Sequence, residues 1–171
     1  MTIDDTDEAS LSFYAGNVPV DESLLAPLGR MTWAAIRLHH SIRDTLGLHL
    51  TDGLSDKPFD DTLGGVIKRL EEHARDAGEP WESEIAQWSA TYGRPAQSLR
   101  DRITHAVAYT AEDDRQALRT SLHPKHGGHE RVTEALLVDA SGKLVLASVR
   151  LHQVRESCKS QNPLPLGEHN G

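Results

Sequence analysis

Residues 134–158 read EALLVDASGKLVLASVRLHQVRESC, and this stretch decides the fold class. Its apolar side chains return at strict intervals of three and four residues, which is the period of one face of an α-helix. The positions that keep this spacing are Leu137, Ala140, Leu144, Ala147, Leu151, Val154 and Cys158. One opposing signal, the tetrad at 139–142 with its Ser-Gly pair, is typical of a β-hairpin turn. Because seven positions outweigh one tetrad, we predict a single helix with Thr133 as its N-cap.

Four earlier segments show the same helical period. They predict helices over about 21–46, 61–77, 81–92 and 95–108, with glycine and proline between them. In the first of these helices, Trp33 and Ile36 are expected to widen the buried stripe. A further helical turn or two is predicted over 110–119, where Thr110-x-x-Asp113 has the spacing of a capping pair. The predicted fold class is therefore all-α, an up-and-down bundle of four to five helices.

The chain of 171 residues suits a single domain. We expect the bundle to span 21–158, between a flexible N-terminal tail at 1–20 and a disordered C-terminal tail at 159–171. The single cysteine, Cys158, has no partner for an intramolecular disulfide, which fits a reducing cytoplasm. No apolar run is long enough to cross a membrane, and the acidic start of the chain does not look like a signal peptide. We therefore expect a cytoplasmic protein with no membrane partner.

Charge is distributed unevenly along the chain. The net charge of −8 argues against a general nucleic-acid coat. Residues 1–93 carry 7 Lys/Arg against 17 Asp/Glu, whereas residues 94–131 carry 7 against 5 and are the only segment with a positive balance. This basic segment suits a local phosphate site on a protein that otherwise repels nucleic acid. Chance clustering of charge is the other explanation for so small a surplus.

The basic segment contains Arg100-Asp101-Arg102-Ile103-Thr104-His105, which combines a guanidinium, a carboxylate and an imidazole. A fixed cation beside a group that titrates near neutral pH is the minimum needed to act on a phosphodiester. On a helix, Asp101 and His105 are i,i+4 neighbours, so we expect Asp101 to orient His105 while Arg100 approaches from another side. The alternative is a surface helix whose charged face is simply solvated.

The spacing of Arg100 and His105, with the polar Asp101 directly after the arginine, resembles the R-x4-H signature of the HEPN superfamily. HEPN domains are small helical bundles. Many are metal-independent endoribonucleases, and many serve as toxins or as parts of defence systems. The resemblance is detailed over residues about 80–120 and extends elsewhere only to the general helical plan.

This resemblance implies a catalytic site and its partners. His105 would move the proton of the ribose 2′-hydroxyl or of the leaving oxygen, and Arg100 would stabilise charge on the phosphate. Arg102 would assist with phosphate, and the other cations expected to bind RNA are Arg94, Arg119, Lys125 and Arg131. The expected substrate is single-stranded RNA, with no metal and no cofactor. The expected assembly is a homodimer with His105 near its interface, and an antitoxin or another protein is a further expected partner. The alternative is an inactive HEPN-like bundle that binds a partner protein or a nucleotide.

Three other groups of residues suggest functions but have plainer explanations. His123, His126 and His129 recur at three-residue intervals, yet a loop rich in Gly and Pro fixes no metal geometry and no fourth ligand is evident. A basic loop that closes over a phosphate is the other possible function of these residues. His39 and His40 point about 100° apart on a helix, so we expect one flanking and one surface histidine. The aromatic residues within 81–92 follow the buried stripe, which favours core packing over stacking on bases.

Overall fold

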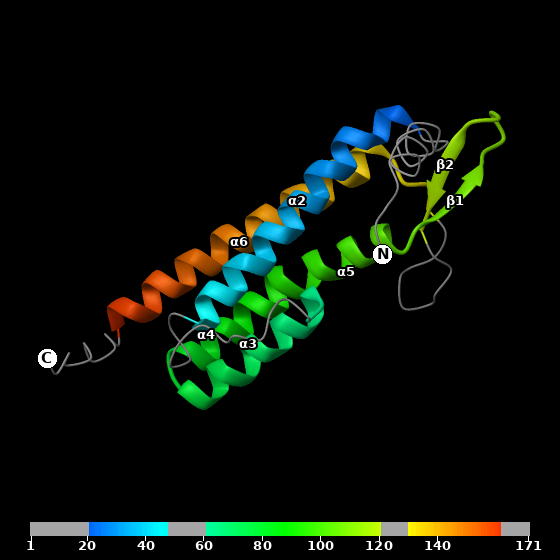
Figure 1. Ribbon diagram of the computed structural model, residues 1–171. Helices are drawn as coiled ribbons and strands as arrows, with labels where there is room; N and C mark the ends of the chain where they lie inside the picture. The colour runs from blue at the N-terminus through cyan, green and yellow to red at the C-terminus, as the bar shows by residue number, and fades with distance from the viewer. Residues whose placement is uncertain (1–20, 48–60, 121–129, 162–171) are drawn as a thin grey trace, which may run out of the picture.

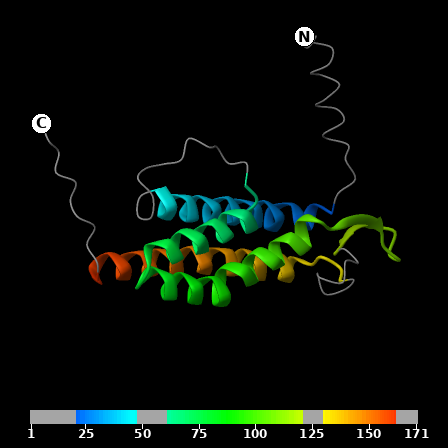
Figure 2. The ribbon, with the colours of Figure 1, turned by 90° about the horizontal axis from the view of Figure 1, so that it is seen from below.

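The computed structural model describes residues 21–47, 61–120 and 130–161, and this part of the chain is mostly helical (Figure 1). Two long helices lie side by side, and a layer of shorter helical segments covers one side of them (Figures 1 and 2). The helical elements are α2 (Glu22–Thr45), α3 (Leu63–Ala77), α4 (Trp81–Trp88), the π-helical η2 (Ser89–Gly93), α5 (Arg94–Thr104) and α6 (Glu134–Gln161). A two-stranded sheet, β1 (Val107–Thr110) and β2 (Gln116–Arg119), extends from one end of the bundle.

Helix α6 confirms the prediction of one continuous helix, because residues 134–161 contain no strand. The leucines at 137, 144 and 151 and Cys158 are completely buried, while Val154 is partly buried against the core. The Thr133 hydroxyl accepts a hydrogen bond from the Leu136 amide at 3.2 Å, as expected of an N-cap. The hairpin tetrad at 139–142 lies inside the helix, so the long apolar period outweighs the local turn signal. The helix also continues three residues beyond the predicted boundary at 158.

Helix α2 packs along α6, and both helices begin at the end of the bundle that carries the β-sheet (Figure 1). Asp21 is the N-cap of α2, and its carboxylate accepts a hydrogen bond from the Ser23 amide at 3.0 Å. Between the two helices, the Ser41 and Ser148 hydroxyls meet at 2.7 Å. The predicted width of the buried stripe was wrong, because Trp33 is 66% and Ile36 48% exposed. Both side chains project from the bundle and leave an apolar surface uncovered.

The layer of α3, α4, η2 and α5 packs on this pair through aromatic side chains. Trp81 and Trp88 are buried, which confirms core packing rather than an exposed stacking surface. The Trp88 indole N–H donates to the carbonyl oxygen of Ala147 at 2.8 Å and so ties α4 to α6. The predicted break near Gly93 and Pro95 does not occur, because η2 carries the backbone directly from α4 into α5. A Cβ at Gly93 would lie 2.9 Å from the Trp88 ring, so glycine allows this close turn.

The directions of the helices differ from strict up-and-down alternation. Helices α2, α3 and α6 run away from the β-sheet, whereas α4, η2 and α5 run back towards it (Figures 1 and 2). Alternation is therefore kept from α3 through α5 to α6, but α2 and α3 run the same way. No helix in the three described ranges is both long and apolar enough to cross a bilayer.

Helix α5 ends at Thr104, four residues before the predicted end, and the segment after it forms a hairpin instead of further helical turns. The antiparallel register pairs Val107 with Arg119 and Thr110 with Gln116. Strand residues such as Val, Tyr and Thr favour extended backbone, which competes with continuation of the helix. The turn uses a left-handed residue, Asp114, with φ of 59°, a conformation that aspartate tolerates better than most residues. Of the capping pair predicted at 110–113, Thr110 is therefore the last residue of β1 and Asp113 lies in the turn that follows.

The C-terminal tail was predicted over 159–171, but residues 159–161 belong to α6. The rest of that tail, the predicted tail at 1–20 and the three-histidine loop with Lys125 lie outside the described residues.

The seam between α2 and α6 predicts a sharp contrast between two leucines. Leu144→Ala removes a completely buried side chain and should lower the free energy of unfolding by about 3 kcal/mol. Leu25→Ala truncates a leucine that is half exposed on α2 and should change it by less than about 1 kcal/mol. Urea denaturation followed by circular dichroism measures both changes. Equal losses in the two variants would contradict the assignment of the core.

Candidate functional site

The C-terminal end of α5 carries Arg100 and His105, the two residues of the R-x4-H pattern. Arg100 is partly buried and lies in the last turns of the helix. His105 is the C-cap, with φ of −98° and ψ of 16°, and its side chain is exposed. Its backbone N–H still bonds to the Asp101 carbonyl oxygen at 3.1 Å. The imidazole therefore stands at the junction of helix and hairpin, rather than in the middle of a helix as predicted.

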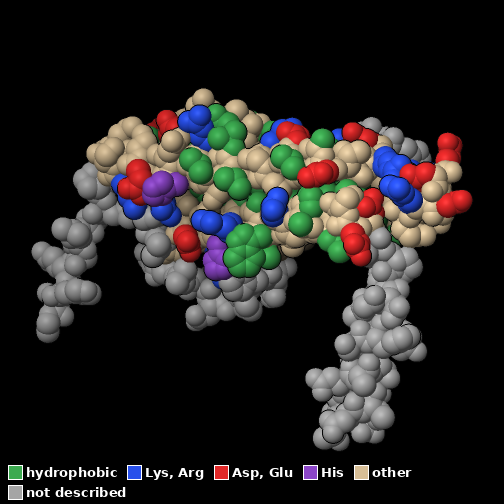
Figure 3. All heavy atoms as spheres, turned by 90° about the horizontal axis from the view of Figure 1, so that it is seen from above, with side chains coloured by type: hydrophobic (Ala, Val, Ile, Leu, Met, Phe, Trp, Pro, Cys, Tyr) green, Lys and Arg blue, Asp and Glu red, His purple; other side chains and the backbone are tan. Residues whose placement is uncertain are grey.

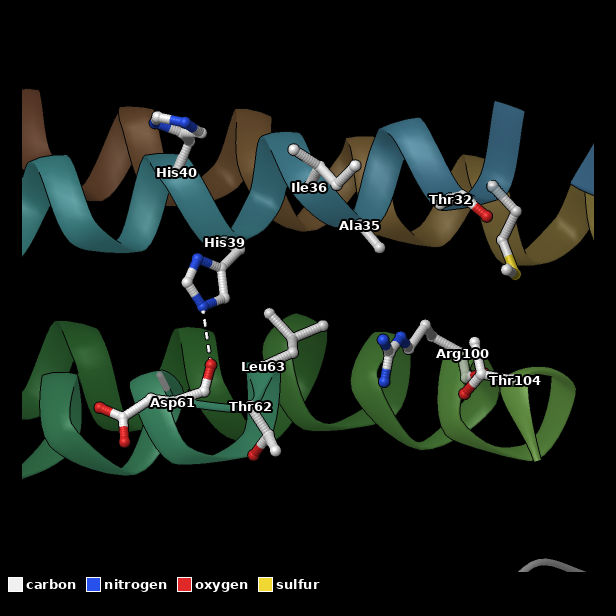
Figure 4. Close-up of a pocket in the computed structure, with 11 residues that line it drawn as sticks. Thr32, Ala35, Ile36, His39, His40, Asp61, Thr62, Leu63, Arg100 and Thr104 are labelled. Carbon is white, nitrogen blue, oxygen red and sulfur yellow. Dashed lines mark hydrogen bonds between the residues drawn. The ribbon is translucent and has the colours of Figure 1, made fainter. Parts of the chain in front are cut away.

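Arg100 also lines a pocket of about 300 Å³ between α2, the start of α3 and α5. In Figure 4, Arg100 and Thr104 reach the gap from α5, while His39 reaches it from α2, with Leu63 between them. The wall on the α2 side includes apolar residues such as Ile36 and Met31. The pocket thus combines one guanidinium with an apolar wall that is large enough for a planar ring.

His39 and His40 behave as the sequence predicts for adjacent helical positions. His39 is half-buried, and its Nε2 lies 3.1 Å from the backbone oxygen of Asp61, whereas His40 is exposed. Both border the Arg100 pocket. Sequence reasoning missed this neighbourhood, because it arises where α2, the start of α3 and α5 come together, and α2 and α5 are about sixty residues apart in the chain.

Asp101 binds groups other than the imidazole it was expected to orient. Its carboxylate accepts hydrogen bonds from Arg100 Nη1 at 2.8 Å and from Gln97 Nε2 at 2.5 Å. The Gln97 contact has i,i+4 spacing and could have been found in the sequence. Because α5 ends before residue 105, His105 is not held in the helical position that would face Asp101. Asp101 therefore holds the Arg100 guanidinium and not His105.

Arg102 is engaged in a structural contact. Its guanidinium pairs with the carboxylate of Glu130, and its Nε is buried with no hydrogen-bond partner in the described ranges. The backbone N–H of Thr120 donates to the Glu130 carbonyl oxygen at 2.9 Å. Arg102 therefore ties the end of α5 to the segment before α6, and its guanidinium is engaged there by a carboxylate.

The other predicted RNA-binding cations also contact the protein itself. The Arg119 guanidinium lies over the Tyr109 ring, 5.1 Å from its centroid, and Arg131 lies 3.8 Å from the carboxylate of Asp113. Arg94 donates to the Glu71 carboxylate at 2.7 Å and 3.2 Å. Among the described residues of the basic segment, most of the positive charge is thus paired within the protein.

The Glu71 carboxylate is held by two neighbours, since the Ser89 hydroxyl also donates to it. Partial burial by itself would raise the pKa of Glu71, but the hydrogen bonds and charge of Arg94 and the Ser89 hydrogen bond outweigh it. The net effect holds the pKa of Glu71 below its ordinary value. This contact fixes α3 against η2 and the first turn of α5, and so supports the helix that carries Arg100.

Two further groups were tested against the structure. No cluster of three metal-binding side chains occurs within residues 21–47, 61–120 and 130–161.

Cys158 is buried at the C-terminal part of α6, and burial raises the pKa of its thiol to about 11. A thiol with so high a pKa is a poor nucleophile, which fits the place of Cys158 on the buried stripe of α6.

Comparison of the chain with protein-family models, curated proteins and solved structures finds no match.

The Glu71 contact predicts a defined pH dependence of stability. Because its folded pKa lies below the unfolded value, the contact stabilises fully above about pH 5 and is lost as the pH falls through the folded pKa. Glu71→Gln should lower the free energy of unfolding at pH 7 by about 1–2 kcal/mol, and this difference from the wild type should shrink towards pH 3.

Glu72→Gln is the matched control, because Glu72 is exposed and lies 3.5 Å from Lys68. It should change stability by less than about 0.5 kcal/mol at every pH. Urea titrations at several pH values measure both variants, and a pH-independent Glu71 effect would show that the charge of this carboxylate is unimportant.

Proposed function

We propose that this chain is a metal-independent endoribonuclease of HEPN type that acts on single-stranded RNA. The observation that carries the proposal is that Arg100 and His105 lie at the same end of α5. Arg100 lines a pocket, and His105 is exposed five residues further along the chain. The helical plan, with R-x4-H on a late helix, supports the resemblance on which the proposal builds. Five residues span about 7.5 Å along a helix, so two long side chains can reach one phosphodiester and its 2′-hydroxyl.

The reaction needs one charge-stabilising group and one group that moves a proton. The ribose 2′ oxygen attacks the neighbouring phosphorus, the P–O5′ bond breaks, and the products carry a 2′,3′-cyclic phosphate and a 5′-hydroxyl. His105 takes the proton from the 2′-hydroxyl or gives one to the leaving 5′ oxygen, and water completes the other transfer. Arg100 binds the nonbridging oxygens, on which negative charge grows in the transition state.

Asp101 acts as a positioning residue in this scheme. It holds the Arg100 guanidinium from one side at 2.8 Å and is itself fixed by Gln97. A guanidinium has five N–H donors, so one carboxylate contact leaves other donors for a phosphate. The apolar pocket wall beside Arg100, including Ile36, offers a surface for the base of a neighbouring nucleotide.

The proposal includes partners as well as chemistry. A single motif supplies one cation and one proton-transfer group, so we propose a homodimer that brings two motifs into one assembly. An antitoxin or another protein that controls the nuclease is part of the same proposal, as is a cytoplasmic site of action.

A second function, a non-catalytic bundle that binds a protein or nucleotide, is favoured by one specific observation. Arg100 is already paired with a carboxylate, and the paired state lowers the free positive charge that a phosphate would meet. Such a pocket can hold a nucleotide through its apolar wall without cleaving RNA. Activity measurements separate the two functions.

Purified protein should cleave single-stranded RNA in the presence of EDTA and leave 2′,3′-cyclic phosphate ends. His105→Ala and Arg100→Ala should each lower the cleavage rate about 100-fold or more, because each removes a group that acts in the transition state. Arg100→Lys should also lower the cleavage rate substantially, since an ammonium cannot form the planar bidentate hydrogen bonds that a guanidinium makes with phosphate. Gel analysis of end-labelled RNA measures the rates and the product ends.

His152→Ala and Arg115→Ala are the matched controls, because both side chains are exposed and lie outside the pocket. They should cleave at the wild-type rate. Wild-type protein that binds nucleotides but leaves varied RNAs intact would support the binding bundle instead. Full activity in His105→Ala would place the chemistry elsewhere in the chain.

A further inference from the structure

The long helices α2 and α6 enclose an open apolar groove on the face that points away from α3, α4 and α5. Figure 3 shows hydrophobic side chains gathered along this face over both helices. The groove has a volume of about 940 Å³, and its lining is almost entirely apolar. Trp33 forms a ridge on the α2 side, and Val138, Val145 and Val149 follow the α6 side, all of them exposed. Apolar surface of this extent on a folded domain marks an interaction site.

We propose that a second copy of this chain covers this groove and forms an antiparallel homodimer about a twofold axis. The proposal stands on residues outside the Arg100 pocket, so it does not require the proposed nuclease activity. It also moves the dimer contact from His105, where the sequence led us to expect it, to the face of α2 and α6.

The groove is self-complementary in shape. The Trp33 ridge lies beside positions with little side chain, among them Gly29 on α2 and Gly142 on α6, where a Cβ would meet nothing within 4 Å. A twofold axis across the middle of the groove reverses each helix on its own copy. An axis midway between Gly142 and Val145 on α6 brings Gly142 of one copy opposite Val145 of the other. A position without a side chain then faces a larger one on each copy.

Charge along this face also fits an antiparallel copy. Both helices start at the same end of the bundle, with exposed acids in their first turns, Glu22 on α2 and Glu134 on α6. Further along α2, the exposed cation Arg37 lines the groove. Antiparallel pairing places the acidic end of one copy on the basic region of the other and opposes the helix dipoles, whereas a parallel pairing would set like charges together.

The size of the face suits a specific dimer. Helix α2 has 24 residues, so at 1.5 Å per residue it is about 36 Å long, and α6 is longer. Two helices about 10 Å apart present a strip about 20 Å wide, or roughly 700 Å² per copy, close to the roughly 800 Å² per partner of a standard interface.

This arrangement has a consequence for the Arg100 pocket. An antiparallel twofold pairs α2 with α2, and the pocket lies on the flank of α2 that faces α3 and α5 (Figure 4). Both pockets of the dimer then open along the same edge, one on each side of the paired α2 helices. One RNA strand that follows this edge meets two Arg100 side chains in turn.

Light scattering on the full chain at tens of micromolar tests the proposal. Wild-type protein should have twice the mass of the chain. Trp33→Glu, and Val145→Glu as a second variant on the other helix, should raise the dissociation constant about 30-fold or more, because each places an unpaired charge in the contact. Val107→Glu is the matched control, since Val107 is equally exposed but lies on the hairpin, and it should remain dimeric. Circular dichroism verifies that each variant is folded.

Cysteine cross-linking tests the direction of the pairing. With an axis midway between Gly142 and Val145, the two copies of residue 145 lie about 4.5 Å apart along the helices, which is within disulfide reach. The two copies of residue 138 lie about 16 Å apart, which is too far. Val145→Cys should form a covalent dimer under mild oxidation and Val138→Cys should not, while the buried Cys158 stays silent in both.

The outcomes are decisive and need no RNA. A wild-type monomer would overturn the proposal, and the groove would then be covered by residues 1–20 or by another protein. A Trp33→Glu dimer would place the contact on a different face. Cross-linking of both cysteine variants would show a parallel pairing and contradict the antiparallel dimer. Loss of RNA cleavage in any variant bears on the proposed function alone.

Discussion

The packing of α6 along α2 is the constraint on which the rest of the structure depends. The completely buried leucines of α6 and the buried residues of α2 form one continuous core. The short helices then attach to this pair, most clearly through the buried hydrogen bond from the Trp88 indole to Ala147. Because α4 is held there and η2 continues without a break, α5 has only one course across the bundle. The positions of Arg100 and His105 follow from that course.

The elements with a long apolar period were predictable from the sequence, and α6 is the clearest example. An apolar repeat over seven positions predicts which face of the helix is buried, since all seven side chains lie on the same face. The end of α5 was not predictable in the same way. The strands within residues 104–119 are only four residues long, and they are held by contacts with the segment before α6, such as the hydrogen bond from the Val132 amide to the Leu118 carbonyl oxygen. Arg102 at the end of α5 pairs with Glu130 in the same segment. Local periodicity carries no information about partners 28 residues away.

The shared helix end of Arg100 and His105 was predictable from the sequence, but the contacts around these two residues were not. Arg100 and His105 do share one end of a helix, as the spacing indicated, but Asp101 holds the arginine and not the imidazole. Four arginines of the basic segment are paired with carboxylates, so its positive balance in the sequence does not become a basic surface. The pocket beside Arg100 depends on α2, and no local pattern could have shown that. Ion pairs and pockets between distant helices are properties of the packed chain, and this is where sequence reasoning ended.

The central claim is that the end of α5 and the pocket beside it form the phosphate-binding site. Nuclear magnetic resonance of isotope-labelled protein, titrated with a 2′-O-methyl oligoribonucleotide that cannot be cleaved, tests it without relying on activity. If this site binds phosphate, the Arg100 side-chain Nε–H signal and the His105 ring signals should shift most, together with the signals of residues that border the pocket. Signals from α4 and from the far end of α6 should stay in place. Saturable shifts centred on another surface, with Arg100 and His105 unmoved, would contradict it.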